Sequence, residues 1–351
     1  MTKAVRHVIN AIMNASIVRK DVAVIGAGPS GLFAVFECGM LGLKCAVFDA
    51  LTEIGGQCTA LYPEKPIYDI PGFPSVLAGD LIANLEAQAA PFAPEYNLGQ
   101  QIVAISKEDG FWRIKSSKGM EILASAIIIA GGAGAFGPNR PPLEGIEDYE
   151  GHSVFYMVRR KDDFRGKKVV IAGGGDSAVD WALSLAPITE KLYVVHRRDK
   201  FRAAPESVRQ MDELVNKGQI EMIVPYQLHG LKGHDKNLSE VIVQTLDGAE
   251  RSLPADTLLP FFGLAAELGP LADWGLAVDH KHITVDPATC QTNIEGIYAV
   301  GDIAAYKNKL KLILTGFNEG ALAAHAIHHQ IFPDKELHFE YSTTKGVPGA
   351  A

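Results

Sequence analysis

The sequence has little of what metal-binding, dithiol and nucleic-acid-binding proteins carry. Its 351 residues include four cysteines, and no two of these form a Cys-x-x-Cys pair. The common zinc-site spacings and a local redox dithiol are therefore excluded. The formal net charge is −8, which argues against a nucleic-acid binder, because phosphate recognition requires a basic surface. The four thiols, Cys38, Cys45, Cys58 and Cys290, are expected to stay reduced in a cytoplasmic protein.

Long apolar runs are also missing. The longest stretch without a charged residue, 122–139, is 18 residues long and contains four glycines and a proline. This density of helix breakers predicts a strand that enters a loop, and no segment is typical of a transmembrane helix. Residues 1–20 hold four basic residues and no acid, and 5–18 suit a short amphipathic helix. We expect a plain N-terminal extension; the alternative, a targeting peptide, lacks a secretory core and cleavage site.

A first nucleotide-binding pattern begins near residue 22. The apolar run 22–25 predicts a buried parallel strand, and the turn Gly26-x-Gly28-x-x-Gly31 follows it directly. A helix and a second strand come next, and the strand ends at Asp49, 18 residues after the last glycine. The three glycines permit a tight turn, backbone approach to a pyrophosphate and close packing of helix on strand. The helix N-terminus suits phosphates and the acid suits a ribose, so this segment predicts dinucleotide binding.

The same pattern returns in the middle of the chain. The apolar run 169–172 leads into Gly173-x-Gly175-x-x-Ala178, and a helix and a strand follow. At the end of that strand His196 lies 18 residues after the alanine, the spacing that the acid has in the first pattern. We therefore expect a second dinucleotide-binding unit.

The residues at the ends of these two second strands select different ligands. Asp49 suits a free ribose hydroxyl and repels a 2′-phosphate. Arg197 and Arg198, with Arg202 one helical turn further on, suit a 2′-phosphate through charge-assisted and often bidentate bonds. The first unit is therefore expected to bind an unphosphorylated dinucleotide and the second NADP(H). The alternative for the two adjacent arginines is a solvated charged loop.

A third stretch returns the chain to the first unit. A strand over 296–300 ends in Gly301-Asp302, where the acid faces a polyol such as the ribityl chain of a flavin. The following helix, about 316–330, aims its N-terminus at the flavin ring. Two dinucleotide folds in one chain indicate one tightly held flavin and one exchanging nicotinamide.

The fold class predicted from these segments is α/β, with two Rossmann-like dinucleotide-binding domains. The NADPH domain, 129–290, is inserted into a discontinuous FAD domain, 1–128 and 291–351. The two linkers between them lie at one place and allow the domains to rotate as a hinge.

The chain resembles the pyridine nucleotide–disulfide reductase family. Within that family it is similar to the ferredoxin–NADP reductases of the thioredoxin-reductase-like type, over nearly the whole length beyond residue 20. The segments that carry the resemblance are Gly55-Gly56-Gln57, Leu61-Tyr62-Pro63-Glu64-Lys65, Tyr68-Asp69-Ile70-Pro71-Gly72-Phe73-Pro74, 173–181, 196–202, Leu314-Thr315-Gly316-Phe317 and Ser342-Thr343. Their combination is highly specific, although no single segment is.

The resemblance and the glycine patterns together imply two sets of site residues. The FAD set is Gly26, Gly28, Ser30, Gly31, Asp49, Gly56, Gln57, Tyr62, Ile102, Phe136, Asp302, Ser342 and Thr343. The NADP set is Gly173, Gly175, Asp176, Ser177, Ala178, His196, Arg197, Arg198 and Arg202. No metal ligand is expected.

Two tyrosines are expected to stack on the flavin. The resemblance implies that Tyr62 covers one face of the ring. It also implies a homodimer whose C-terminal tail places Tyr341 over the other face of the partner's flavin. Asp49 stands where glutamate is more usual, so the hydrogen bond to the ribose must be made by a shorter side chain. Tyr341 stands where a histidine occurs, so stacking is expected without an acid–base role.

The chain lacks the Cys-x-x-Cys pair that true thioredoxin reductases carry before the NADPH-binding strand. Residues 156–163 contain no cysteine, and Cys58 has no neighbouring partner, so a disulfide relay is excluded. The expected activity is that of a ferredoxin–NADP⁺ reductase: a hydride passes between NADPH and FAD, and single electrons pass to ferredoxin or flavodoxin. The alternatives are an NADPH diaphorase or quinone reductase, and a flavin-binding sensor, which would need a damaged NADPH site.

An acidic electron carrier needs a basic docking site on this acidic protein. Three basic clusters are candidates, with ordinary solvated lysines as the alternative for each. They are Arg159-Arg160-Lys161, then Arg165 with Lys167 and Lys168, and finally Lys307, Lys309 and Lys311. Asp69 is a candidate polar neighbour of the flavin, or else a turn residue before Pro71.

Overall fold

The computed structural model describes residues 17–132, 134–335 and 346–347. It forms two compact units, and each is discontinuous in sequence. Unit 1 contains the described residues up to Ala60, Pro66–Ala135 and those from Ala266 on. Unit 2 contains Leu61–Lys65 and Phe136–Ala265. The two passages of the chain between the units form β9 (Ala135–Pro138) and β17 (Leu264–Glu267), which pair as a two-stranded sheet.

Unit 1 is built on a seven-stranded sheet in the order β5-β2-β1-β8-β7-β6, with β20 also paired to β8. Its strands are β1 (Val18–Ile25), β2 (Cys45–Asp49), β5 (Glu95–Leu98), β6 (Ile102–Glu108), β7 (Phe111–Ser116), β8 (Glu121–Ile129) and β20 (Ile297–Ala299). The strands β5, β2, β1, β8 and β20 run parallel, whereas β6, β7 and the start of β8 are antiparallel. The parallel segments 22–25, 45–48 and 126–129 in the middle of the sheet are apolar, and most of their residues are buried because both faces of the sheet are covered.

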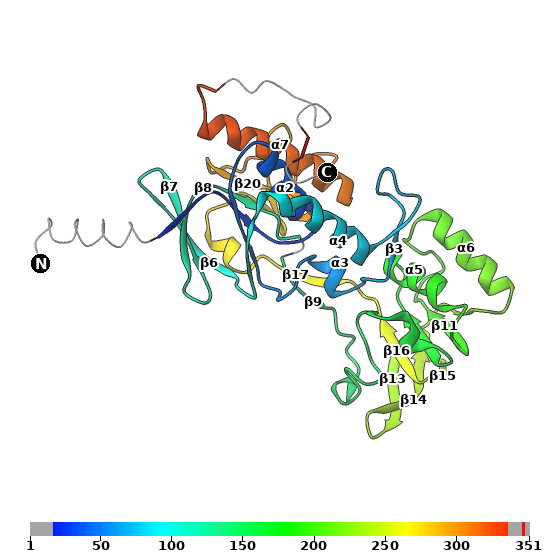
Figure 1. Ribbon diagram of the computed structural model, residues 1–351. Coiled ribbons are helices and arrows are strands. Elements are labelled where there is room, and N and C mark those ends of the chain that lie inside the picture. The colour runs from blue at the N-terminus through cyan, green and yellow to red at the C-terminus, as the bar shows by residue number, and fades with distance from the viewer. Residues whose placement is uncertain (1–16, 133, 336–345, 348–351) are drawn as a thin grey trace, which may run out of the picture. The chain divides into compact units, whose positions relative to one another are not determined.

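Helices cover one face of this sheet. The helices of unit 1 are α2 (Pro29–Met40), α3 (Gln57–Ala60), α4 (Ala78–Ala89) and α7 (Ile313–Ile331). α2 and α7 lie side by side (Figure 1), and their apolar residues pack on the sheet side chains Val22, Val24 and Ile128. The approach is close, because a Cβ atom at Gly320 of α7 would lie 3.3 Å from the Cα of Ala34 in α2.

The opposite face of the sheet packs on short elements. These are β18 (Val278–Asp279), β19 (His282–Thr284), β21 (Ala304–Ala305), and the 3₁₀ turns η4 (Gly269–Asp273) and η5 (Gly301–Ile303). Ile127 and Ile129 of β8 belong to this second core with Leu271 and Ile283. Unit 1 also contains β3 (Pro66–Ile67), β4 (Val76–Leu77) and η1 (Ala90–Phe92). No helix among the described residues is long and apolar enough to cross a bilayer.

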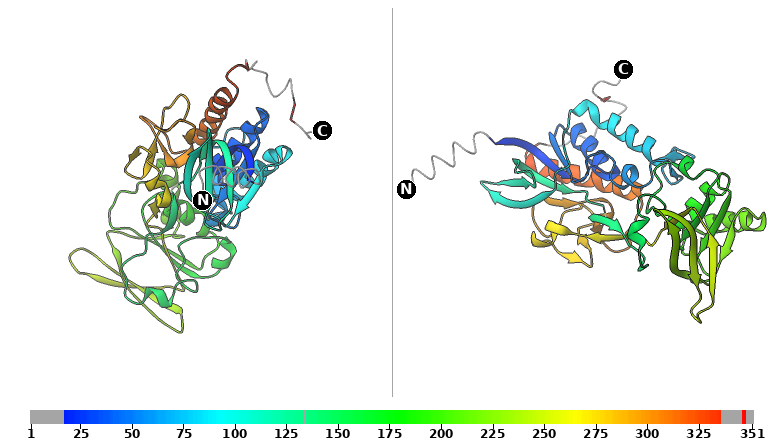
Figure 2. Two further views of the ribbon diagram at one scale, coloured as in Figure 1. Left: turned by 90° about the vertical axis from the view of Figure 1, so that its left-hand side faces the viewer. Right: turned by 90° about the horizontal axis from the view of Figure 1, so that it is seen from below.

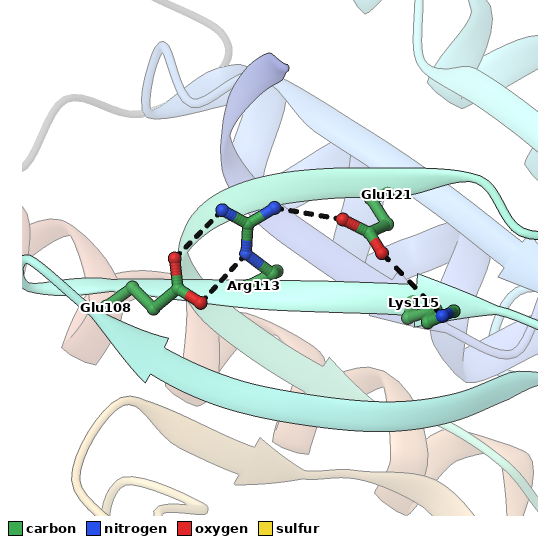
Figure 3. A network of polar contacts seen from close by, with 4 residues as sticks. All are labelled: Glu108, Arg113, Lys115 and Glu121. Carbon is green, nitrogen blue, oxygen red and sulfur yellow. Dashed lines mark hydrogen bonds and ion pairs between the residues drawn. The ribbon is translucent and has the colours of Figure 1, made fainter. Parts of the chain in front are cut away.

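The antiparallel strands of unit 1 carry a charged surface network. Arg113 of β7 donates to both oxygens of Glu108 at 2.8 and 2.9 Å, and also to Glu121 at 2.9 Å (Figure 3). Lys115 approaches Glu121 at 3.9 Å. The hydrogen bond from Arg113 lowers the pKa of Glu108. These partly exposed contacts link β7 to β6 through Glu108 and to β8 through Glu121, and ion pairs of this kind contribute little stability.

Unit 2 repeats the central topology of unit 1. Its parallel sheet has the order β12-β11-β10-β16, which is the strand order 3-2-1-4 that β5-β2-β1-β8 also follows. The elements are β10 (Lys168–Ala172), β11 (Lys191–Val195), β12 (Glu221–Ile223), β16 (Thr257–Pro260), α5 (Asp176–Leu185), α6 (Pro205–Asn216), η2 (Ile146–Asp148) and η3 (Lys161–Phe164). A second, antiparallel sheet consists of β13 (Gln227–His234), β14 (Asn237–Gln244) and β15 (Glu250–Pro254), of which β13 and β14 form a long hairpin (Figure 2).

The N-terminal boundary differs from the sequence-based expectation. β1 begins at Val18, so the N-terminal extension is shorter than the predicted 1–20, and the predicted helix over 5–18 does not reach residue 18. The strand is longer because its polar start finds partners. Val18, Arg19 and Lys20 pair with the start of β8, and Lys20 Nζ lies 2.9 Å from Glu95. Residues 1–16 lie outside the described residues.

Candidate dinucleotide sites

The first glycine turn, between β1 and α2, has the geometry that its three glycines predict. Gly26 has φ of +113°, and a Cβ atom there would lie 2.2 Å from the carbonyl oxygen of Ala130. A Cβ at Gly31 would lie 2.0 Å from the carbonyl oxygen of Gly26, so this residue permits the close packing of helix on turn. At Gly28 a Cβ would meet nothing within 4 Å. The chain around Gly28 therefore leaves open space at the N-terminus of α2.

The N-terminus of α2 is suited to an anion. Gly28 is its N-cap, no side chain caps it, and its first turn contains no acid. The unpaired N–H groups and the helix dipole therefore favour negative charge there. Ser30 lies where two other glycines come close: a Cβ atom would lie 2.8 Å from its Oγ if built at Gly301 and 2.1 Å if built at Gly316. The starts of α2 and α7 and the turn after β20 thus meet at one place.

Asp49 at the end of β2 is already bound to the glycine turn. Its carboxylate accepts from the N–H of Ala27 at 2.7 Å and of Leu51 at 2.8 Å. Burial raises the pKa of Asp49, and these two hydrogen bonds partly offset that effect. A carboxylate has about four acceptor positions, so two remain for a ribose.

The segment after Asp49 folds back onto the same turn. Gly55 N–H donates to the carbonyl of Ala27 at 2.8 Å, and a Cβ at Gly56 (φ +57°) would lie 3.2 Å from the Cα of Gly28. Gln57 starts α3, and its Nε2 would lie 3.8 Å from a Cβ at Gly132, after β8. Gly56 and Gln57 thus lie beside the space that Gly28 leaves open.

A buried ion pair that the sequence analysis missed holds the turn around Asp302. Glu319 of α7, 1% exposed, accepts from Gly301 N–H at 2.7 Å, Tyr306 Oη at 2.8 Å and Lys309 Nζ at 2.9 Å. Lys309 Nζ also donates to the carbonyl of Gly301 at 2.5 Å. Asp302 itself is exposed. A single acid inside the apolar run of a helix was the signal for this network.

This ion pair corrects one of the candidate docking clusters. The side chain of Lys309 is 6% exposed, so it is unavailable to a protein partner. Lys307 and Lys311 on either side are exposed.

The remaining predicted FAD residues are less informative. The side chain of Ile102 is 3% exposed within the core of unit 1, so only its backbone is available to a ligand. Tyr62 belongs to unit 2, where it packs on the core and lies under Lys65 Nζ at 5.6 Å from the ring centroid. Phe136 lies in β9, but its side chain is outside what the structure describes, as are Tyr341, Ser342 and Thr343. The roles assigned to them stay predictions.

The second glycine turn, between β10 and α5, reproduces the first. Gly173 N–H donates to Val195 O at 3.0 Å, as Gly26 N–H donates to Phe48 O at 2.8 Å. A Cβ at Gly173 would lie 2.6 Å from the carbonyl oxygen of Phe261 and 3.0 Å from the Cβ of Ala178. Gly175 is again the N-cap of its helix, with nothing within 4 Å of a built Cβ. His196 therefore occupies the structural position of Asp49.

The basic loop after β11 is tied to this second turn. His196 packs against the glycine turn, because a Cβ at Gly174 would lie 2.2 Å from its ring. Burial lowers the pKa of His196, and the neighbouring arginines lower it further. Arg202 N–H donates to Gly174 O at 2.7 Å, and Asp176 accepts from Ala204 N–H at 2.9 Å.

The side chains at the edge of this loop are available to a ligand. Arg197, Arg198, Arg202 and Ser177 are exposed. Arg202 lies in the loop between β11 and α6 and not on a helical turn as the sequence suggested, because the loop bends back to the glycine turn.

A hollow of about 940 Å³ opens beside the basic loop, and sequence analysis did not identify it. Phe201, Val208, Met222 and Val224 give it apolar walls. Its polar lining residues are Asp199, Lys200, Arg202, Arg209 and Asp212. The apolar walls suit a flat aromatic group, and Lys200 and Arg202 at the edge suit a phosphate, since Arg209 is already paired with Glu206 and Glu213. The sequence signal was the alternation of apolar and charged residues after His196.

Comparisons with known proteins agree with this geometry. A family model described as pyridine nucleotide-disulphide oxidoreductase matches residues 20–323. The chain is 60% identical over 335 residues to the ferredoxin–NADP reductase of Rhodospirillum rubrum, which covers 94% of this chain and 97% of the relative. It is 59% identical over 329 residues to the ferredoxin–NADP reductase of Paramagnetospirillum magneticum, covering 93% and 98%.

A solved structure of Lactococcus lactis thioredoxin reductase in its FR conformation matches with a TM-score of 0.77 and 25% identity, covering 90% of this chain and 99% of that one. The predicted α/β fold with two dinucleotide-binding domains is thereby confirmed. By these matches the chain belongs to the pyridine nucleotide–disulphide oxidoreductase family and, within it, to the ferredoxin–NADP reductases.

Proposed function

We propose that this chain catalyses the ferredoxin–NADP⁺ reductase reaction, in which NADP⁺, a proton and two reduced ferredoxins give NADPH and two oxidised ferredoxins. Unit 1 corresponds to the proposed discontinuous FAD domain, and unit 2 to the proposed NADPH domain. The bounds differ from the expected ones, because 129–135 and 266–290 belong to unit 1 and Leu61–Lys65 belong to unit 2. The observation that carries the proposal is the contrast between the two equivalent strand ends. One ends in a carboxylate bound to its own glycine turn, and the other in a histidine followed by two exposed arginines.

The residues of unit 1 fit FAD. The open space at Gly28 and the uncapped start of α2 suit the pyrophosphate, and the two remaining acceptor positions of Asp49 suit the adenosine ribose. Gln57 at the start of α3 and Asp302 in the turn η5 are the other proposed contacts, and the ion pair beneath Gly301 fixes that turn. FAD, when bound there, supplies the exchange between a two-electron hydride donor and one-electron carriers.

The residues of unit 2 fit NADP(H). Gly175 and the start of α5 suit its pyrophosphate, and the exposed Arg197, Arg198 and Arg202 bind the 2′-phosphate. The hollow beside Phe201 accommodates the adenine. His196 stays neutral above its lowered pKa, so it leaves charge recognition to the arginines.

Ferredoxin, or flavodoxin in its place, is the proposed electron carrier, because the relatives in Rhodospirillum and Paramagnetospirillum are ferredoxin–NADP reductases. The proposed homodimer would exchange its C-terminal tails, with Tyr341 over the partner's flavin and Ser342 and Thr343 beside it. Tyr62 would cover the other ring face. Light scattering on the full chain measures the oligomeric state directly.

Anaerobic stopped-flow mixing tests the proposal. We expect NADPH to bleach the flavin faster than NADH, and the reduced protein to pass electrons rapidly to ferredoxin. The double variant Arg197→Ala/Arg198→Ala should weaken NADPH binding roughly tenfold to a hundredfold and leave NADH almost unchanged, because it removes only contacts to the 2′-phosphate.

The matched control is Arg159→Ala/Arg160→Ala, which removes two adjacent exposed arginines elsewhere in unit 2 and should bleach like the wild type. If NADPH bleaches the flavin quickly but no electrons pass to ferredoxin, the protein is a quinone reductase or diaphorase instead.

A further inference from the structure

A small apolar surface with basic neighbours spans the loop after β21 and the first turn of α7. Leu310 is 65% exposed and Leu314 42% exposed, and Lys307 and Lys311 are exposed in the same segment. We call these four residues the lysine–leucine patch. Single exposed leucines are ordinary on protein surfaces, but two within five residues, next to lysines, form a contact surface with an apolar centre and a cationic rim.

The charge of the patch is not cancelled by nearby acids. Within the described part of the chain, no carboxylate lies within ion-pair distance of Lys307 or Lys311. Lys311 Nζ instead lies 2.8 Å from Nε2 of His282, whose pKa is lowered by burial and then by Lys311. The exposed acids Asp302 and Asp279 raise the pKa of His282 and so lie near the patch, but neither forms an ion pair with Lys311. The patch therefore presents net positive charge on a protein whose formal charge is −8.

Half of the basic residues in the other two candidate clusters are paired with acids, whereas Arg159, Lys161 and Lys167 form no ion pair among the described residues. Arg160 lies 3.7 Å from Asp163, Arg165 lies 2.6 Å from Asp162, and Lys168 lies 3.6 Å from Glu190. Such pairs reduce the field that a partner would meet.

The patch borders the proposed flavin site within unit 1. The segment that carries it starts after the Gly301–Asp302 turn and ends just before Gly316, and both glycines approach Ser30. Between the two exposed lysines, Lys309 is buried and holds both Gly301 and Glu319. This anchor fixes the loop, so the patch is presented on an ordered surface beside the proposed flavin site.

We infer that the lysine–leucine patch is the docking surface for an acidic one-electron carrier of the ferredoxin type. This inference rests on the proposed function and adds where the carrier binds. The lysines attract the acidic partner against the overall negative charge, and the leucines provide the dehydrated centre of the contact. Each carrier accepts one electron, so two dock in succession for every NADPH oxidised.

The test compares carriers of opposite charge. The probes are an acidic [2Fe–2S] ferredoxin and basic cytochrome c, with NADPH as the electron donor. In Lys307→Glu/Lys311→Glu, the KM for ferredoxin should rise about tenfold at low salt with kcat almost unchanged, and the salt dependence should flatten. The same variant should reduce cytochrome c faster than the wild type does.

Two further variants separate docking from general electrostatics. Lys118→Glu/Lys217→Glu makes the same change in net charge at exposed positions outside the patch, and its KM for ferredoxin should change less than about twofold. Leu310→Ala leaves the charge unchanged and should raise that KM about fivefold at every salt concentration, because it removes apolar contact. Stopped-flow bleaching by NADPH should be the same in all variants.

Two outcomes would overturn the inference, and they differ. If the patch reversal raises the KM for ferredoxin no more than the control reversal does, the carrier docks elsewhere while the proposed function stands. If NADPH bleaches the wild-type flavin but no electrons reach ferredoxin at any salt concentration, the proposed function fails and the partner with it.

Discussion

Gly28 and Gly31 are three residues apart in one turn, yet their surroundings predict opposite consequences of the same substitution. Alanine at Gly31 would place its Cβ 2.0 Å from a backbone carbonyl oxygen, which cannot move aside without opening the turn. Alanine at Gly28 meets nothing within 4 Å, and the φ of −74° there is ordinary for alanine. We therefore expect Gly31→Ala to lose about 3 kcal/mol of folding stability and Gly28→Ala almost none.

The affinity for FAD, unlike the folding stability, should be lowered by the Gly28→Ala substitution. Gly28→Ala folds normally but should bind FAD at least tenfold more weakly, because its methyl group fills the space proposed for the pyrophosphate. Thermal unfolding of the apoproteins and flavin fluorescence during titration measure the two effects independently. Normal FAD affinity in Gly28→Ala would mean that the pyrophosphate lies elsewhere.

Residues whose role follows from spacing were predictable, and residues whose role follows from tertiary contact were not. The glycine turns and the contrast between Asp49 and His196 are local patterns, and the structure shows these segments in equivalent positions. Lys309 looked like a surface lysine because nothing nearby in sequence indicates its partner. Glu319 lies ten residues away, and only the packing of α7 on the Gly301 turn brings the two together.

At the scale of elements, this buried pair joins Glu319 in the interior of α7 to Lys309 in the loop before it, and removing one partner should destabilise the fold. In Lys309→Met the carboxylate of Glu319 stays buried with its cationic partner removed, and we expect a loss of about 3–5 kcal/mol. The Gly301 carbonyl also loses its donor, so FAD should dissociate faster. Thermal unfolding and the rate of flavin release measure the two effects.

The controls use neighbouring positions. Lys307→Met changes an exposed lysine two residues away and should melt like the wild type. The double variant Lys309→Met/Glu319→Gln removes both charges and should recover part of the loss. A wild-type melting temperature in Lys309→Met would show that the pair contributes nothing to stability.

Element boundaries were predictable only where the apolar pattern marks them. The central strands were identified by their apolar segments, such as 22–25 and 169–172. The start of β1 was not, because Arg19 and Lys20 look like part of a basic extension until β8 and Glu95 provide their partners. The hollow beside α6 was likewise missed, although its lining residues all fall within 199–224, because only folding brings the loop, the helix and the strand around one space.

At the scale of the whole molecule, the core of unit 1 contains groups that lose protons less readily than they would in an unfolded chain. Burial raises the pKa of Tyr96, Tyr298 and Cys290 each to about 12, from ordinary values of 10.0 for tyrosine and 9.0 for cysteine. Between about pH 9 and 12 the unfolded chain therefore binds fewer protons than the folded one. Stability is fully retained below this window, and the free energy of unfolding should fall as pH rises through it.

Tyr96 is the most useful of these groups to change, because its buried hydroxyl has no hydrogen-bond partner among the described residues. Tyr96→Phe removes the titrating group without breaking such a bond, so its stability at pH 7 should equal or exceed that of the wild type. Its melting temperature should then fall less steeply between pH 9 and 12. Tyr68→Phe, at a side chain that is 70% exposed, is the matched control and should follow the wild-type curve. Equal slopes for Tyr96→Phe and the wild type would show that this hydroxyl titrates at the same pH in the folded and unfolded protein.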